Sequence, residues 1–260
     1  MKRIADPKSR IRPSGLWTVV PVRGITTGKS RLAGVLDPAA RSRLNRWLLE
    51  RTLAIIGRRD GGLGRCVVVS PCEAALARAR SAGAVALREP EAVGLNRAAR
   101  RAAKLAAKRG AQSVLVLPCD LPRITGRSLA ALARAARGPQ AMVIAPDKGG
   151  AGTNALVVKA HPPFEFRFGA RSYARHLSLA AERGWTAAIC TRADLSFDLD
   201  TPADLAAWAR SARAGRMAVR PDAIVPVKAL TQARPRRGAP SKAPGYAAKP
   251  VGRKTRKEEE

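Results

Sequence analysis

Basic residues suited to binding phosphate follow the first apolar run of the chain. Residues 16–22 form this run, and Lys29 and Arg31 lie in the Gly- and Thr-rich segment that comes directly after it. A loop between a strand and a helix leaves backbone N–H groups free to bind phosphate, and two cations add charge where a triphosphate would lie. The segment therefore predicts a phosphate-binding loop with Lys29 and Arg31 as its charged groups.

The spacing of the glycines in this loop disfavours a Walker-type P-loop. That motif has four residues between its first Gly and its Gly-Lys pair, whereas Gly24 and Gly28 enclose three. A P-loop also leads directly into its helix, whereas Pro38, behind the natural N-cap Asp37, starts the next helix well downstream of Lys29. On spacing alone, a basic surface loop is the alternative to a nucleotide site.

Asp120 follows a run of four apolar residues, 114–117, that is typical of a buried central strand. The carboxyl end of such a strand is where open α/β sheets bind ligands. A carboxylate there commonly holds Mg²⁺ against the phosphates of a nucleotide. Asp120 is therefore a candidate metal ligand, and the simpler alternative is an Asp that only caps the turn.

Two further carboxylates, Asp198 and Asp200, lie one residue apart near the end of the predicted domain. If this segment is a strand, their side chains point to the same side, and either one could be a second metal ligand. The competing interpretation is that Asp200 or Thr201 caps the last helix, with Pro202 as its first residue. The two interpretations are compatible.

Small polar residues in two later segments could hold a second substrate. Thr153 closes the Gly-rich stretch 146–153, where glycine permits a close approach of backbone to ligand; a plain hairpin turn would use the same glycines. Gly169 and Ser172 lie at a predicted helix start, which is a natural anion site. Helix capping without a ligand is the alternative there.

Apolar runs and amphipathic stretches alternate along the chain, which predicts a Rossmann-like, doubly wound α/β domain with a mostly parallel sheet. The continuous apolar strands fit burial on both faces of that sheet. The predicted strands are 16–22, 66–69, 84–87, 114–117, 142–145 and 155–158, and the predicted helices are 38–56, 71–80, 95–109, 128–137, 171–183 and 203–213.

The composition agrees with one such domain flanked by basic segments. The 260 residues carry a formal net charge of +30, and 46% of them are hydrophobic. We expect a disordered lead-in at 1–14, a folded domain at 15–212 and a disordered Pro-, Ala-, Lys- and Arg-rich tail at 213–260. A short apolar segment at 223–227 could dock on the domain.

The charge and the cysteines narrow the classes of function. A strongly basic chain concentrates anions of every kind, so phosphorylated metabolites and nucleic acid are both candidate partners. The four cysteines form no CxxC pair, which disfavours zinc and fits reduced thiols in a cytoplasmic protein. The basic N-terminus has no apolar run of a secretory signal, and no stretch approaches the roughly 20 apolar residues of a membrane helix.

Taken together and in order, these segments resemble the 2-phospho-L-lactate guanylyltransferase (CofC) family of the MobA-like nucleotidyltransferases, which have the nucleotide-diphospho-sugar transferase type of fold. The resemblance covers roughly residues 16–212. The matching motifs are Val20-Pro21-Val22, Lys29-Ser30-Arg31-Leu32, Gly94-Leu95-Asn96, Asp120-Leu121-Pro122, Gly152-Thr153-Asn154-Ala155-Leu156, Phe168-Gly169 with Ser172, and Asp198-Leu199-Asp200-Thr201-Pro202.

The resemblance implies a role for each motif. The implied catalytic residues are Lys29, Arg31 and Asp120. The implied nucleotide-binding residues are Pro21, Val22, Arg23, Lys29, Gly94, Leu95 and Asn96, the acid-binding residues Thr153, Gly169 and Ser172, and the Mg²⁺ ligands Asp120, Asp198 and Asp200. Two positions depart from the family's pattern: Gly28 stands where relatives often have Ala, and Arg23 where they often have Lys.

The implied reaction is guanylyl transfer from GTP to a small phosphorylated acid, with release of pyrophosphate, in coenzyme F420 biosynthesis. The acid is 3-phospho-D-glycerate, phosphoenolpyruvate or 2-phospho-L-lactate. Two alternatives stay open: another MobA-like transferase acting on molybdopterin or a sugar phosphate, and a basic nucleic-acid-binding protein. A homodimer, and weak contact of the basic tail with nucleic acid, also stay open.

Overall fold

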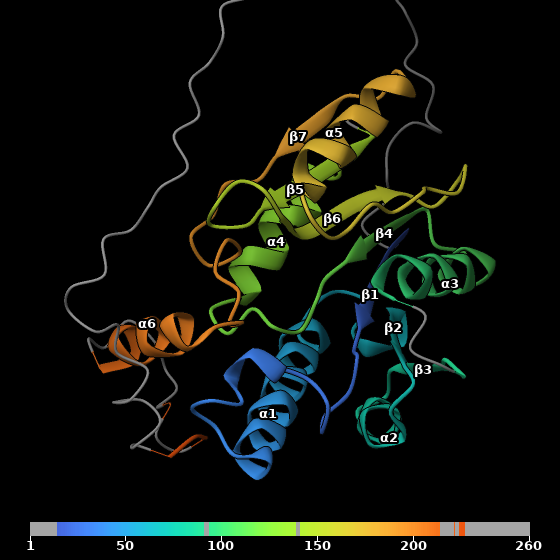
Figure 1. Ribbon diagram of the computed structural model, residues 1–260. Coiled ribbons are helices and arrows are strands. Elements are labelled where there is room, and N and C mark those ends of the chain that lie inside the picture. The colour runs from blue at the N-terminus through green and yellow to red at the C-terminus, as the bar shows by residue number, and fades with distance from the viewer. Residues whose placement is uncertain (1–14, 91–93, 139–140, 214–220, 222–223, 227–260) are drawn as a thin grey trace, which may run out of the picture.

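A seven-stranded sheet with the order β3-β2-β1-β4-β6-β5-β7 runs through the computed structural model of the chain (Figure 1). The structure describes residues 15–90, 94–138, 141–213, 221 and 224–226. The strands are β1 (Leu16–Pro21), β2 (Cys66–Ser70), β3 (Val85–Arg88), β4 (Ser113–Val116), β5 (Met142–Pro146), β6 (Thr153–Lys159) and β7 (Ala187–Ile189). The predicted α/β architecture is confirmed.

The direction of the strands decides which loops meet. The four strands β3, β2, β1 and β4 are parallel, so their carboxyl ends share one edge of the sheet. Strand β6 is antiparallel to both β4 and β5, with Leu156 opposite Val116. Because β6 runs the other way, its first residue, Thr153, lies at the same edge as the carboxyl end of β4.

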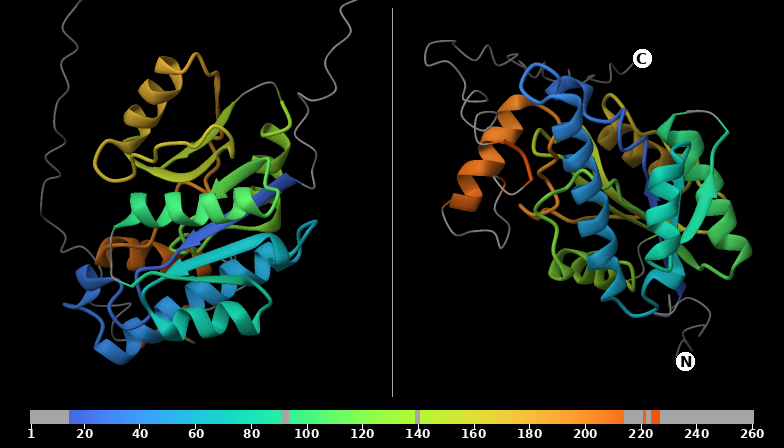
Figure 2. Two further views of the ribbon diagram at one scale, coloured as in Figure 1. Left: turned by 90° about the vertical axis from the view of Figure 1, so that its right-hand side faces the viewer. Right: turned by 90° about the horizontal axis from the view of Figure 1, so that it is seen from below.

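Helices cover both faces of the sheet, as Figure 2 shows with α3 on one side and α1 and α2 on the other. The buried side chains of α1, α2 and α4 pack on one face, and those of α3 and α5 pack on the other. The helices are α1 (Pro38–Gly57), α2 (Glu73–Ser81), α3 (Leu95–Lys108), α4 (Gly126–Ala135), α5 (Ser172–Glu182) and α6 (Pro202–Arg213).

Two-sided burial explains the continuous apolar strands. In β2, Val67 and Val69 enter the core on the α3 side, while Val68 enters the core on the α1 side. On the helices, α3 meets the sheet mostly through alanines such as Ala99 and Ala102, both fully buried. Small side chains let the helix lie close to the sheet, where apolar contact stabilises the layer.

A third apolar cluster docks the last helix on the outer side of α1. The rings of Trp47 and Trp208 lie 5.2 Å apart between their centroids. Ile224 and Val225, inside the predicted tail, are buried in the same cluster, so these two residues of the apolar segment 223–227 dock as expected. The lead-in 1–14 and most of the tail 213–260 lie outside the described residues.

Some element boundaries differ from the predictions for local reasons. Helix α4 begins two residues earlier than expected because Thr125 and Ser128 form a reciprocal capping box. Helix α2 begins two residues later, after the Ser70 hydroxyl accepts the Cys72 N–H. Strand β7 was not predicted at all; it is a three-residue edge strand without a buried side chain, so its hydrophobic pattern is weak.

No helix in the described part of the chain is long and apolar enough to span a membrane.

The start of α1 agrees with its sequence signals and provides a test of the local energetics. Pro38 is the first helical residue, and the Asp37 carboxylate accepts the backbone N–H of Ala40 at 2.7 Å. We expect Asp37→Ala to lower the free energy of unfolding by about 1 kcal/mol in urea denaturation, because it removes this cap. Asp37→Asn should lose less, since its amide oxygen still accepts; equal losses would contradict the capping role.

Candidate active site

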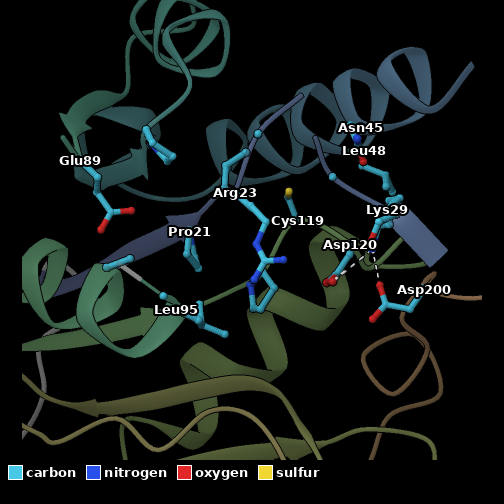
Figure 3. A pocket seen from close by; sticks show the side chains of 18 of the residues that line it. Pro21, Arg23, Lys29, Asn45, Leu48, Glu89, Leu95, Cys119, Asp120 and Asp200 are labelled. Atoms are coloured by element: carbon cyan, nitrogen blue, oxygen red, sulfur yellow. Dashed lines mark hydrogen bonds and ion pairs between the residues drawn. The ribbon is translucent and has the colours of Figure 1, made fainter. Parts of the chain in front are cut away.

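A cleft of about 500 Å³ opens at the edge of the sheet where the four parallel strands end (Figure 3). Its wall takes residues from the segments that follow β1, β2, β3 and β4, which is the expected ligand position in an open α/β sheet. The lining residues are Pro21, Val22, Arg23, Gly24, Gly28, Lys29, Ser30, Arg31, Asn45, Leu48, Pro71, Glu89, Gly94, Leu95, Ala98, Pro118, Cys119, Asp120 and Asp200.

Hydrogen bonds hold the loop after β1 at two points. At its start, the backbone N–H of Val22 donates to the Val69 carbonyl at 2.9 Å, which holds the loop against β2. Further on, the Asn45 side chain on α1 donates to the Ile25 carbonyl at 2.8 Å. A Cβ at Gly28 would lie 2.8 Å from the Asn45 amide nitrogen, so a side chain there would require Asn45 or the loop to shift.

Lys29 is held in an uncommon backbone conformation at the floor of the cleft. Its φ of 58° and ψ of 40° are left-handed, which costs a non-glycine residue on the order of 1 kcal/mol. Its side chain is only 9% exposed. The surrounding structure therefore fixes this residue in place, as is common at functional sites.

The Lys29 ammonium lies between two carboxylates. Its Nζ is 2.6 Å from Asp200 Oδ1 and 3.3 Å from Asp120 Oδ2. Burial alone would lower the pKa of Lys29, but the attraction of Asp120 and Asp200 outweighs it and holds that pKa above its ordinary value. Lys29 is therefore a permanent cation at this point of the cleft.

A backbone hydrogen bond brings the two acidic segments together: the N–H of Leu199 donates to the Asp120 carbonyl at 3.0 Å. Phe197 and Leu199 are buried, which leaves the intervening Asp198 and Asp200 half-buried on the other side. The two Asp side chains were expected to point to the same side if this segment were a strand. The segment forms no strand, but the burial of Phe197 and Leu199 produces the same alternation.

The helix-capping alternative for this segment is also realised. The Asp204 carboxylate accepts the N–H of Thr201 at 2.8 Å, and the Thr201 hydroxyl accepts the N–H of Asp204 at 3.3 Å. Thr201 therefore caps α6, with Pro202 as the first helical residue. Because Thr201 supplies the cap, the Asp200 carboxylate is free to face Lys29.

The local charge around Asp120 is negative enough to suit a divalent cation. Asp198 is half-buried and feels the like charges of Asp120 and Asp200, and both effects raise its pKa. Asp120 and Asp200 thus share the single ammonium of Lys29, and Asp198 adds a third carboxylate beside them. Oxygen ligands of this kind are those that Mg²⁺ prefers. In the arrangement that Lys29 now holds, no three acidic, His or Cys side chains of the described residues converge on one point.

The remaining predicted nucleotide residues divide into two groups. Pro21, Val22, Arg23, Arg31, Gly94 and Leu95 all line the cleft. Asn96 instead faces the acid-binding segment: its side chain accepts the N–H of Phe168 at 2.6 Å and donates to the Phe168 carbonyl at 3.0 Å. Asn96 therefore ties the start of α3 to the loop that carries Gly169.

The predicted acid-binding residues lie together, beside the cleft but outside its lining. The glycines before Thr153 form a hairpin turn between β5 and β6, as the simpler interpretation expected. The N–H of Tyr173 donates to the carbonyl of Ala151, which joins this turn to the start of α5. Ser172, 2% exposed, is the first residue of α5, and Gly169 has a φ of +113°. Asp198 is likewise outside the cleft lining.

His176 orients the Thr153 hydroxyl. The imidazole is fully buried, and its Nε2 accepts the N–H of Arg167 at 3.0 Å. The proton must therefore be on Nδ1, which lies 3.1 Å from the Thr153 hydroxyl oxygen and donates to it. The hydroxyl proton of Thr153 is then left to donate elsewhere, which suits an anionic ligand.

Sequence reasoning missed three polar residues of this region: Asn45, Glu89 and His176. Asn45 lies on the apolar stripe of α1, where a single polar residue could have been noticed. Glu89, which follows β3, could have been found by the same strand-end argument that found Asp120. His176 gives no signal in the sequence, because its role depends on contacts with Thr153 and Arg167 that form only in the fold.

The burial of His176 makes stability depend on pH. Burial lowers its pKa from 6.5 to about 4, so as pH falls through this window the unfolded chain takes up the proton first. Stability should fall from pH 6.5 toward pH 4, by up to about 3 kcal/mol from this residue. Urea denaturation of His176→Asn should show a shallower pH dependence, whereas the exposed His161→Asn should match the wild type. An unchanged slope in His176→Asn would contradict this assignment.

Residues 16–208 match the family model described as "Guanylyl transferase CofC like". The chain is 41% identical to a phosphoenolpyruvate guanylyltransferase of Rubrobacter xylanophilus over 74% of this chain and 92% of that protein. It is 36% identical to a 3-phospho-D-glycerate guanylyltransferase of Phenylobacterium zucineum over 74% and 88% of the two chains.

Solved structures of other proteins share this fold. A structure described as a putative nucleotide-diphospho-sugar transferase from Desulfovibrio desulfuricans superposes with a TM-score of 0.63 at 15% identity, covering 84% of this chain and 94% of that one. At that identity the likeness speaks for the fold alone. On the match over 16–208 and the curated relatives, this chain is a nucleotidyltransferase and belongs to the CofC-like guanylyl transferase family.

Proposed function

We propose that this enzyme transfers GMP from GTP to the phosphate of a small phosphorylated acid and releases pyrophosphate. The observation that carries the proposal is the Lys29 ammonium between Asp120 and Asp200 at the floor of the cleft. Relatives named phosphoenolpyruvate and 3-phospho-D-glycerate guanylyltransferases support this class of acceptor. We assign the product to coenzyme F420 biosynthesis and the enzyme to the cytoplasm, where GTP is available.

In the proposed reaction, a phosphate oxygen of the acid attacks the α-phosphorus of GTP in line. A new P–O bond forms, and the bond from the α-phosphorus to the bridging oxygen of pyrophosphate breaks, with its electron pair leaving on pyrophosphate. The attacking phosphate is already an anion, so the step needs no general base. Catalysis then rests on positioning and on neutralising negative charge.

The charges of the cleft support this division of work. Arg23, Lys29 and Arg31 all line it, and we propose that they contact the phosphates of GTP. Asp120 and Asp200, with Asp198 beside them, would hold Mg²⁺. The ion would supply positive charge against the phosphates during transfer.

For the acceptor, we propose a site formed by Thr153, Gly169 and Ser172. The buried hydroxyl of Thr153, oriented by His176, would donate to the acid, and Ser172 with the α5 N-terminus would face its negative charge. Asn96 joins this region to the nucleotide side through Phe168. The short polar side chains suit a small acid with few groups to recognise.

The proposal is tested by pyrophosphate release from GTP and Mg²⁺ with each of 3-phospho-D-glycerate, phosphoenolpyruvate and 2-phospho-L-lactate. We expect release with one acid, no comparable release with ATP, and a product of the mass of the guanylylated acid. If folded protein releases no pyrophosphate with any of the three acids, the phospho-acid proposal is overturned. A molybdopterin or sugar-phosphate acceptor would then be the next to test.

Lys29→Ala should reduce turnover by about 100-fold or more, since it removes a fixed cation that would contact the phosphates of GTP. Lys29→Arg keeps the charge and serves as the matched variant, with partial activity expected because the guanidinium has a different shape. Circular dichroism should report folded protein in both cases. Turnover of Lys29→Ala near the wild-type value would show that the nucleotide loop is assigned to the wrong segment.

Gly28→Ala tests whether the geometry of the loop matters. The new Cβ would lie 2.8 Å from the Asn45 side chain and 2.9 Å from the Gly24 carbonyl, so the loop has to shift. We expect kcat/KM for GTP to fall by about tenfold, as expected for a misplaced catalytic loop. Gly34→Ala is the control, because no atom lies within 4 Å of its Cβ. Equal activity of the two variants would contradict a tightly fitted loop.

A further inference from the structure

The cleft contains a second acidic group far from the Lys29 centre. Glu89 directly follows β3 and lines the cleft, and its side chain lies at the end opposite Asp120 and Asp200, with Arg23 between them (Figure 3). Nothing in the phosphoryl chemistry requires a carboxylate at this end. A nucleotide that places its phosphates at Lys29 and Arg23 would extend its base toward Glu89.

Glu89 is buried without a hydrogen bond that accounts for its burial. It is 4% exposed, and its Oε1 has no hydrogen-bond partner. Burial raises its pKa against the opposing influence of Arg101 and Arg97, but neither arginine forms an ion pair with it among the described residues. An unsatisfied buried carboxylate oxygen is costly, so a donor supplied by a ligand would relieve a cost that the free protein carries.

The surroundings of Glu89 suit the flat face of a base. Pro71, Leu95 and Ala98 also line the cleft, and the backbone N–H of Glu89 donates to the carbonyl of Ser70, the residue before Pro71, at 3.0 Å. Leu95 is 38% exposed and is one of two large hydrophobic side chains in the described chain that are exposed to this degree. An apolar surface beside a carboxylate favours an aromatic ring that carries hydrogen-bond donors on its edge.

We propose that the Glu89 carboxylate accepts the N1–H and 2-amino hydrogens of guanine and thereby selects guanine nucleotides. The inference rests on the proposed guanylyl transfer and adds the residue that recognises the base. Guanine presents these two donors side by side, matching the two oxygens of a carboxylate. Hypoxanthine lacks the 2-amino donor. Adenine presents its unprotonated N1 instead and would leave the carboxylate repelled and unpaired.

The test compares kcat/KM for GTP, ITP and ATP in the wild type and in Glu89→Gln, with whichever of the three acids supports pyrophosphate release. In the wild type, GTP should exceed ITP by about 10- to 100-fold, the range expected for one hydrogen bond to a charged group. Glu89→Gln should bring the GTP-to-ITP ratio to within about threefold of unity, because the amide replaces one acceptor with a donor. Glu50→Gln, at an exposed residue of α1 that pairs with Arg78 outside the cleft, is the matched control and should keep the wild-type ratio.

Calorimetric binding of GTP and ITP to the unmodified protein gives a readout that is independent of turnover and of the variant's folding. Equal affinities for the two nucleotides would overturn the inference, as would a Glu89→Gln variant that keeps the wild-type GTP-to-ITP ratio. A wild type that binds GTP far better than ITP but guanylylates no acid would count against the proposed reaction while supporting base recognition. The two failures are therefore distinguishable.

Discussion

The active site depends on one buried cation held between two anions. Lys29, Asp120 and Asp200 come from the loop after β1, the segment after β4 and the segment before α6, and they meet within 3.3 Å. Each group would be costly to bury alone, whereas together they compensate one another. The three segments are thus held in one arrangement by the same contacts that concentrate charge, and the loss of Lys29 would leave both carboxylates without their cation at the floor of the cleft.

The reversal of β6 builds the second half of the site around this centre. An all-parallel continuation would have placed the first residue of this strand at the opposite edge of the sheet, whereas the antiparallel pairing with β4 brings Thr153 to the nucleotide edge. Two side-chain amides then join the halves: Asn96 bonds to Phe168, and Asn154 donates to the Leu195 carbonyl. The proposed acceptor region is consequently fixed relative to the acidic segments without contributing to the wall of the cleft.

The sequence predicted the fold well because most of it depends on local patterns. Strands buried on both faces are continuous apolar runs, and Asp37 with Pro38 defined the start of α1. The position of Asp120 in the cleft was predicted because ligands bind at the carboxyl ends of strands in open α/β sheets. The roles of Asn96 and His176 could not be predicted, since each depends on partners about 70 or about 20 residues away that only the tertiary structure supplies. The edge strand β7 was missed because it has only three residues and none of them is buried, so its hydrophobic pattern is short and weak.

The carboxylates of the cleft stand out because the chain as a whole is strongly basic. With a net charge of +30, the protein attracts anions, which raises the local concentration of both proposed substrates but discriminates poorly between them. To discriminate between anionic ligands, the protein needs negatively charged side chains. These repel an anion unless a cation or a hydrogen-bond donor offsets the repulsion. Asp120 and Asp200 are such groups at the phosphate end, where a cation compensates them, and Glu89 is one at the base end, where donors on the base would. In the proposed function, attraction by the overall charge and selection by three carboxylates of the cleft are therefore separate roles of the same charge distribution.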